Sequence, residues 1–221
     1  MNDKAPASVS PLPGQPGVYV NEATNEIFKL VEFRDDSKWD SVEVLTTDIN
    51  NFKKKDFFVT QTDKDDLDTN LDTPRRLSQG ETMVIRWIGA EIDQLGYSSN
   101  TPTLTANLGD IKKIISFGYL KATINKIMIA EGQLTKFPTG FGLYGNTTEN
   151  NMSIIAIGMP STAARKELEK QHFITSNHSI NVTVTFQART WLTTDPTTMT
   201  LDATRVLRVH LGGLISAAAT K

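Results

Sequence analysis

Residues 180–189, INVTVTFQAR, constrain the fold more than any other part of this chain, because apolar and polar side chains alternate in them without a break. The apolar positions are Ile180, Val182, Val184, Phe186 and Ala188. The polar positions are Asn181, Thr183, Thr185, Gln187 and Arg189. Successive side chains of a β-strand point to opposite faces, so the pattern predicts a strand with one face on a core. We expect the polar face to meet solvent or another subunit.

Similar segments recur along the chain and predict an all-β protein. They are rich in β-branched or aromatic residues and are bounded by turn-forming residues. The candidate strands are residues 18–20, 27–33, 42–45, 57–61, 83–92, 114–120, 122–130, 153–157, 172–175, 180–189 and 205–215, with weaker candidates at 101–108, 133–137 and 197–201. Residues 83–92, MVIRWIGAEI, are apolar on both faces except at Arg86 and Glu91, which is typical of a strand covered on both sides.

Helical features occur in only two short segments, residues 47–55 and 161–170. The second has Pro160 and Ser161 at its start, followed by good helix formers. Both are short enough to be connections within a β fold, and we expect helices there and nowhere else.

A chain of 221 residues can form one large β domain or two small ones. Residues 96–110 are polar and rich in turn formers, and they divide the chain into nearly equal halves. We therefore expect a flexible N-terminal arm at residues 1–17, which hold four prolines, and two β-sandwiches at residues 18–108 and 109–221. The arm is interpreted either as a disordered tail or as a strap that orders only against a neighbouring subunit.

Composition excludes several classes of protein. No apolar run approaches the roughly 18 residues that a membrane-spanning helix needs, and the N-terminal residues lack the apolar core of a secretory signal. The absence of cysteine excludes disulfides and thiol chemistry, and it suits a reducing cytoplasm. A net charge of −2 argues against a protein whose main task is to bind nucleic acid.

The residue types that carry catalysis or bind metals are scattered. His172, His178 and His210 have no cysteine or carboxylate at a metal-ligand spacing, which favours surface or hydrogen-bonded roles. The chain has no nucleophile elbow, phosphate-binding loop, zinc-protease motif or dinucleotide fingerprint. We therefore assign no catalytic, cofactor-binding or metal-binding residue, no cofactor and no enzymatic activity.

An acidic cluster at residues 63–72 has the composition of a calcium loop but not its spacing. If Asp66 supplies the first ligand, Leu71 stands where a calcium loop needs glycine, and Leu77 stands where it needs the bidentate glutamate. The cluster predicts a solvated acidic loop. A loosely built divalent site at a subunit contact is the alternative.

Several phrases carry a resemblance to a known family. They are residues 69–71 followed by RLSQGE at 76–81 and the strand 83–92, the segment LKATINKIMIAEGQLTKFPTGFGLYG at 120–145, the strand 180–189 and the terminal VLRVHLGGLIS. Together, over residues 57–216, they resemble the jelly-roll coat proteins of small icosahedral bacteriophages. The resemblance implies a viral jelly-roll β-sandwich. The nearly equal halves favour a lean double jelly roll, and a single jelly roll is the alternative.

The resemblance also implies a function. It predicts a structural virion protein, the self-assembling major capsid protein of a tailless, membrane-containing phage, assembled in the host cytoplasm. Its expected partners are further copies in homotrimeric, pseudo-hexameric capsomers, other capsid proteins such as a penton protein, and an internal viral membrane, without sequence-specific contacts to nucleic acid. A penton or minor coat protein is an alternative.

Two alternatives come from other classes of protein. Trp39, Trp191 and the threonine-rich residues 190–204 suggest a glycan-binding β-sandwich, such as a spike or adhesin domain, although tryptophans also serve as core or interface anchors. A cupin-like enzyme is the third interpretation, and three scattered histidines do not readily supply its metal cluster.

Overall fold

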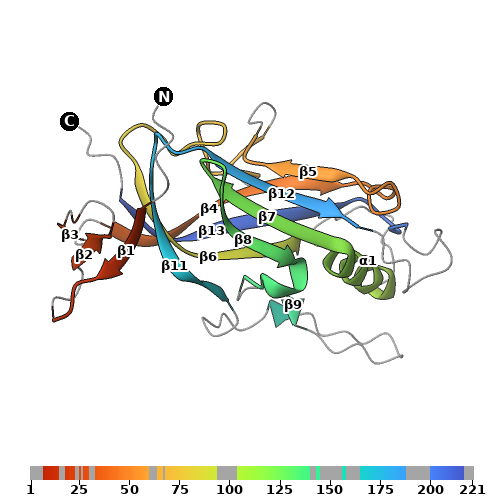
Figure 1. Ribbon diagram of the computed structural model, residues 1–221. Coiled ribbons are helices and arrows are strands. Elements are labelled where there is room, and N and C mark those ends of the chain that lie inside the picture. The colour runs from red at the N-terminus through yellow and green to blue at the C-terminus, as the bar shows by residue number, and fades with distance from the viewer. Residues whose placement is uncertain are drawn as a thin grey trace.

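Antiparallel strands and one longer helix make up the computed structural model (Figure 1), which describes residues 7–14, 18–22, 25, 27–29, 33–59, 64–66, 68–93, 104–139, 143–144, 156–157, 165–187 and 200–216. The elements of the first half are β1 (Ala7–Pro11), β2 (Val18–Asn21), β3 (Ile27–Lys29), β4 (Phe33–Val44), β5 (Lys54–Phe57) and β6 (Thr82–Asp93). Those of the second half are α1 (Leu104–Phe117), β7 (Gly118–Ile124), β8 (Ile127–Gln133), the 3-10 helix η2 (Leu134–Lys136), β9 (Leu143–Tyr144), β10 (Ala156–Ile157), β11 (Lys166–Thr175), β12 (Ile180–Phe186) and β13 (Arg205–Ser216).

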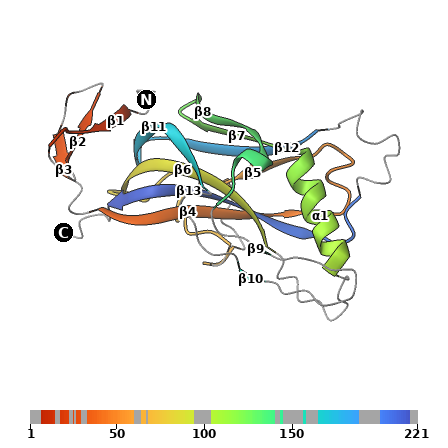
Figure 2. The ribbon, with the colours of Figure 1, turned by 90° about the horizontal axis from the view of Figure 1, so that it is seen from below.

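The strands form two facing sheets, which confirms the prediction of an all-β sandwich. The larger sheet has the order β3-β2-β1-β11-β6-β13-β4, and the smaller has the order β5-β12-β7-β8. Strands β9 and β10 form a separate pair. Figure 2 shows the two sheets as stacked layers, with α1 at one end and β1 to β3 at the other.

Four antiparallel pairs are nested along the chain. They are β4 with β13, β5 with β12, β6 with β11, and β7 with β8. Each sheet therefore combines strands from before and after residue 108, and the described strands do not divide into the two sandwiches expected at 18–108 and 109–221. Of the polar segment 96–110, residues 104–110 begin α1 and residues 96–103 lie outside the described part of the chain.

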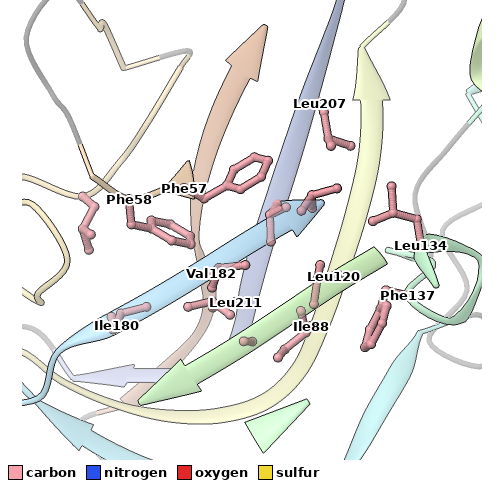
Figure 3. Close-up of a cluster of buried hydrophobic side chains, with 14 of the residues drawn as sticks. Phe57, Phe58, Ile88, Leu120, Leu134, Phe137, Ile180, Val182, Leu207 and Leu211 are labelled. Carbon is pink, nitrogen blue, oxygen red and sulfur yellow. The ribbon is translucent and has the colours of Figure 1, made fainter. Parts of the chain in front are cut away.

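One core fills the space between the sheets (Figure 3). Ile180, Val182, Val184 and Phe186 all point into it and are at most 1% exposed, which confirms the alternation in β12. On the opposite face Gln187 is exposed, whereas Thr183 is only 7% exposed in β12, which lies between strands β5 and β7. The strand ends at Phe186 rather than at residue 189, and residues 188 and 189 lie outside the described part of the chain.

The segment that forms α1 was expected to be two strands, at residues 101–108 and 114–120. Residues 104–117 are helical instead, and β7 begins only at Gly118. The helix buries Ile114 and Phe117 in the core and places Asp110 against Arg205. These long-range contacts outweigh the β-propensity of the isoleucines. No helix in the described ranges is both long and apolar enough to cross a membrane.

Both predicted helices were wrong where the structure describes them. Residues 46–52 form turns and residues 54–57 form β5, while residues 166–170 belong to β11. Pairing of β11 with β6 overrides the helix propensity of its lysines and glutamates. Residues 161–164 lie outside the described ranges.

Several strand boundaries also differ from the expectation. Residues 122–130 are divided by a turn at Asn125 and Lys126, which both have positive φ angles, and residues 134–136 form η2 rather than a strand. The strand expected at 57–61 ends at Phe57, because Phe58 takes a positive φ angle. Of the candidates at 153–157 and 197–201, only residues 156–157 form a strand within the described part.

The N-terminal arm is ordered on its own chain where the structure describes it. Strand β1 pairs with β11, with Ser8 opposite His172, and β2 and β3 continue the sheet. A fully flexible arm at residues 1–17 was therefore wrong for residues 7–14. The added strands cover an edge of β11 that would otherwise expose unpaired backbone groups.

Candidate functional site

Alternation in β13 places two polar side chains on the outer face of the larger sheet. Leu207, Val209 and Leu211 are fully buried in the core, so Arg208 and His210 point the other way. The pairing register sets His210 opposite Trp39 of β4 and Arg208 opposite Glu91 of β6. The neighbouring strands thus bring together the outer-face cluster, which comprises Trp39, Trp87, Glu91, Arg208 and His210.

Charge pairing holds the centre of the outer-face cluster. Nε2 of His210 lies 3.1 Å from Oε1 of Glu91, and Nη1 of Arg208 donates to the same oxygen at 3.2 Å. Burial alone would raise the pKa of Glu91, but the hydrogen bonds and charges of His210 and Arg208 outweigh burial and lower it below 4.5. Glu91 is therefore ionised at neutral pH.

Aromatic rings flank the imidazole of His210 on both sides. The Trp87 ring stacks against it with centroids 6.2 Å apart, and the Trp39 ring lies at 6.3 Å in a tilted arrangement. The guanidinium carbon of Arg165 lies 4.7 Å from the centroid of Trp87, a cation-π geometry. Because Trp87 is only 7% exposed, it is a packed anchor rather than an open platform for a sugar.

A bulge in β6, whose extra residue is Arg86, lies beside Trp87 and opposite two glycines of β13. The register between β13 and β6 shifts between Gly212 and Gly213. A Cβ atom at Gly212 would overlap the indole ring of Trp87, and one at Gly213 would overlap the carbonyl oxygen of Val84. The two glycines of VLRVHLGGLIS are thus required by close packing between β13 and β6.

The outer-face cluster is suited to charge pairing and to contact with another surface. The hydroxyl of Ser41 accepts a hydrogen bond from Nε of Arg208 at 2.9 Å, and Ser41 is 4% exposed.

The other two histidines lie on separate elements. Burial lowers the pKa of His172 on β11, with a further contribution from the charge of Lys170, and burial lowers the pKa of His178. Nδ1 of His178 accepts a hydrogen bond from the backbone N–H of Thr175 at 3.1 Å. Among the residues that the structure describes, no three His, Cys, Asp or Glu side chains are grouped to hold a metal ion.

The acidic segment at 63–72 contains a clamp that sequence analysis missed. Oδ1 of Asn70 accepts the backbone N–H of Trp39 at 2.7 Å, and Nδ2 of Asn70 donates to the carbonyl of Ser37 at 2.7 Å. Lys64 donates to Oδ1 of the buried Asp40 at 2.6 Å. Asp65, Asp66 and Asp72 are exposed, as expected of a solvated acidic loop.

Exposed apolar side chains lie at several places on the described surface. They are Ile27, Leu45, Phe52, Ile127 and Met128, and the last two are adjacent on β8.

The alternation in β13 and the acidic residue Glu91 in a mostly apolar strand were the only sequence signals of the outer-face cluster. Residues 140–142 and residues 188–199, which include Trp191, lie outside the described ranges.

No family model, curated protein or solved structure matched the chain.

Proposed function

We propose that this chain is a structural, self-assembling coat protein built on a single jelly roll. The observation that carries the proposal is the set of four nested antiparallel pairs in two four-stranded layers, with β1 to β3 added beside β11. A jelly roll has eight strands in two sheets, and it is shared by viral coat proteins, lectins and cupins. Because each sheet uses strands from both halves of the chain, we propose a single roll in place of the double roll that the nearly equal halves favoured.

Features of the sandwich favour a scaffold over a container for substrate. Its interior is filled by apolar side chains, among them Phe57, Phe137, Phe186 and Leu211, whereas cupins place a metal cluster there. Asp110 pairs with Arg205 at the start of β13, and the other buried charged residues, Lys38, Asp40 and Asp48, each have an ion-pair partner. A stiff sandwich of this kind suits a subunit that must present fixed surfaces to its neighbours.

The finer parts of the proposal depend on the resemblance of residues 57–216 to phage coat proteins. They are trimeric, pseudo-hexameric capsomers, contacts with a penton protein and an internal membrane, and location in the virion. A penton or minor coat role uses the same fold, and it differs in copy number.

The assembly state of the full-length protein tests the proposal. We expect purified chain, concentrated under varied salt and pH, to form symmetric oligomers or closed shells in electron micrographs and in sedimentation velocity. A protein that stays monomeric under all these conditions would contradict the proposal. In purified particles, hundreds of copies would identify the main shell protein, and a few dozen would identify a vertex protein.

A glycan-binding sandwich is the second candidate, because jelly rolls also serve as lectins and Trp39 is only partly buried beside His210. A glycan array with wild-type protein, Trp39→Ala and Trp191→Ala separates the two functions. Binding that is lost in either variant would favour the lectin, whereas the coat-protein proposal expects no signal.

A further inference from the structure

The edge strands of the two sheets differ in length and in how their backbone is covered. The free edge of β4 is covered by Lys64, Thr69 and Asn70, which bond to its backbone between Ser37 and Ser41. Strand β1 covers β11, while β3 and β5 are only three and four residues long. Strand β8 has seven residues, and within the described ranges it pairs only with β7 (Figures 1 and 2).

The composition of β8 does not protect this open edge. Charged side chains on an edge strand normally discourage pairing with another chain. Edge strand β4 has six, whereas the first four residues of β8, IMIA, have none. Ile127 and Met128 are 42% and 38% exposed, so apolar surface accompanies the free backbone groups.

The side chains of β8 are complementary to those of a second, antiparallel β8. Exposed Lys126 precedes the strand, and exposed Glu131 lies near its end. The pairing of β8 with β7 skips Ile129, so β8 bulges there and Ile127 and Ala130 share one face of the sheet. A two-fold register across this bulge that sets Ile127 opposite Ala130 of the second copy also sets Lys126 opposite Glu131, twice over. Ile127 and Ala130 lie on the core side of the sheet, because their partners Ile124 and Ala122 on β7 are fully buried.

From this geometry we propose that β8 pairs with β8 of a second copy and joins two four-stranded sheets into one continuous sheet. The pairing would satisfy the edge of β8, extend the apolar layer through Ile127 and Ala130, and add two Lys126–Glu131 ion pairs. The inference deepens the proposed self-assembly and rests on it, since it names one of the contacts between copies.

A charge-swap series in the full-length protein tests this contact. Lys126→Glu and Glu131→Lys each oppose like charges across the two-fold axis, so each should raise the dissociation constant of self-association about tenfold. The double variant K126E/E131K restores opposite charges and should return to within about threefold of wild type. Lys112→Glu on exposed α1 surface makes the same change of charge elsewhere and should have no effect.

Sedimentation equilibrium gives the constants, and circular dichroism confirms that each variant is folded. As a measurement without mutation, hydrogen exchange of wild-type protein should show β8 amides gaining protection as concentration rises. If wild type associates while Ile127→Lys and the single swaps associate equally well, the β8 contact is wrong and the proposed self-assembly stands. If wild type never associates, both are wrong.

Discussion

At the scale of single residues, the side-chain amide of Asn70 forms hydrogen bonds with the backbone of edge strand β4, where no neighbouring strand pairs with it in the described ranges. The side chain of Asn70 accepts a hydrogen bond from the backbone N–H of Trp39 and donates one to the backbone carbonyl of Ser37. The backbone N–H of Asn70 donates to the carbonyl of Trp39 at 3.3 Å. Asn70→Ala would leave the N–H of Trp39 and the carbonyl of Ser37 without this partner. We expect a loss of about 1–3 kcal/mol in the free energy of unfolding, measured by urea denaturation.

Asn51→Ala is the matched control, because Asn51 is exposed in the turn before β5. Its replacement should change stability by no more than about 0.5 kcal/mol. Equal stability of the two variants would show that the Asn70 clamp adds nothing to the sheet.

At the scale of elements, helix α1 is tied to the start of β13 by a buried ion pair. Oδ2 of Asp110 accepts from Nε and Nη2 of Arg205 at 2.9 and 2.6 Å, while Oδ1 accepts the N–H of Asp202 at 2.8 Å. Asp110 is fully buried and Arg205 is 5% exposed. Arg205→Met would leave the buried carboxylate with only Lys113, whose Nζ lies 3.9 Å from Oδ1, so we expect a loss of about 3–5 kcal/mol in unfolding free energy.

Two further variants sharpen this prediction. Arg34→Met removes a surface pair with Asp36, in which the arginine side chain is 72% exposed, and it should cost less than about 1 kcal/mol. The double change Asp110→Leu with Arg205→Met should recover part of the loss, because no unpaired charge remains. A thermal midpoint for Arg205→Met equal to wild type would refute the anchoring role.

At the scale of the whole molecule, three half-buried titratable groups make stability fall in acid. The folded-state pKa values of His172 and His178 lie below 6.5. As pH falls below 6.5, the unfolded chain therefore binds more protons than the folded chain, and the free energy of unfolding falls. The folded pKa of Glu91 lies below 4.5, so its contribution is present above 4.5 and is lost as pH falls through the folded value.

We therefore expect the free energy of unfolding to be level above pH 7, to fall below pH 6.5 and to fall again below pH 4.5. Urea denaturation across this range measures the profile. His172→Gln should flatten the first decline, and Glu91→Gln should flatten the second. Stability that increases between pH 7 and pH 5.5 would contradict the lowered pKa values of the half-buried His172 and His178.

Sequence patterns predicted the strands best where the period was long and unbroken. Residues 180–186 and 205–216 became strands, with the expected apolar positions of β12 and β13 in the core. Residues 82–93, which are apolar on both faces, also became a strand. The patterns failed for α1 and for residues 166–170, because those segments take their structure from partners that lie far away in the chain. The outer-face cluster was missed for the same reason, since Trp39, Glu91 and His210 come from three strands.

The sequence alone determined that this chain makes sheets and which side of its main strands is buried, because alternation is local and each side chain's face follows from its position. It did not determine which strands are neighbours. Only the tertiary structure decided that β13 lies between β4 and β6 and that one core serves both halves of the chain. The physical reason is that any strand with an apolar face can pair with several others, and the choice depends on how all buried surfaces and buried charges are satisfied together.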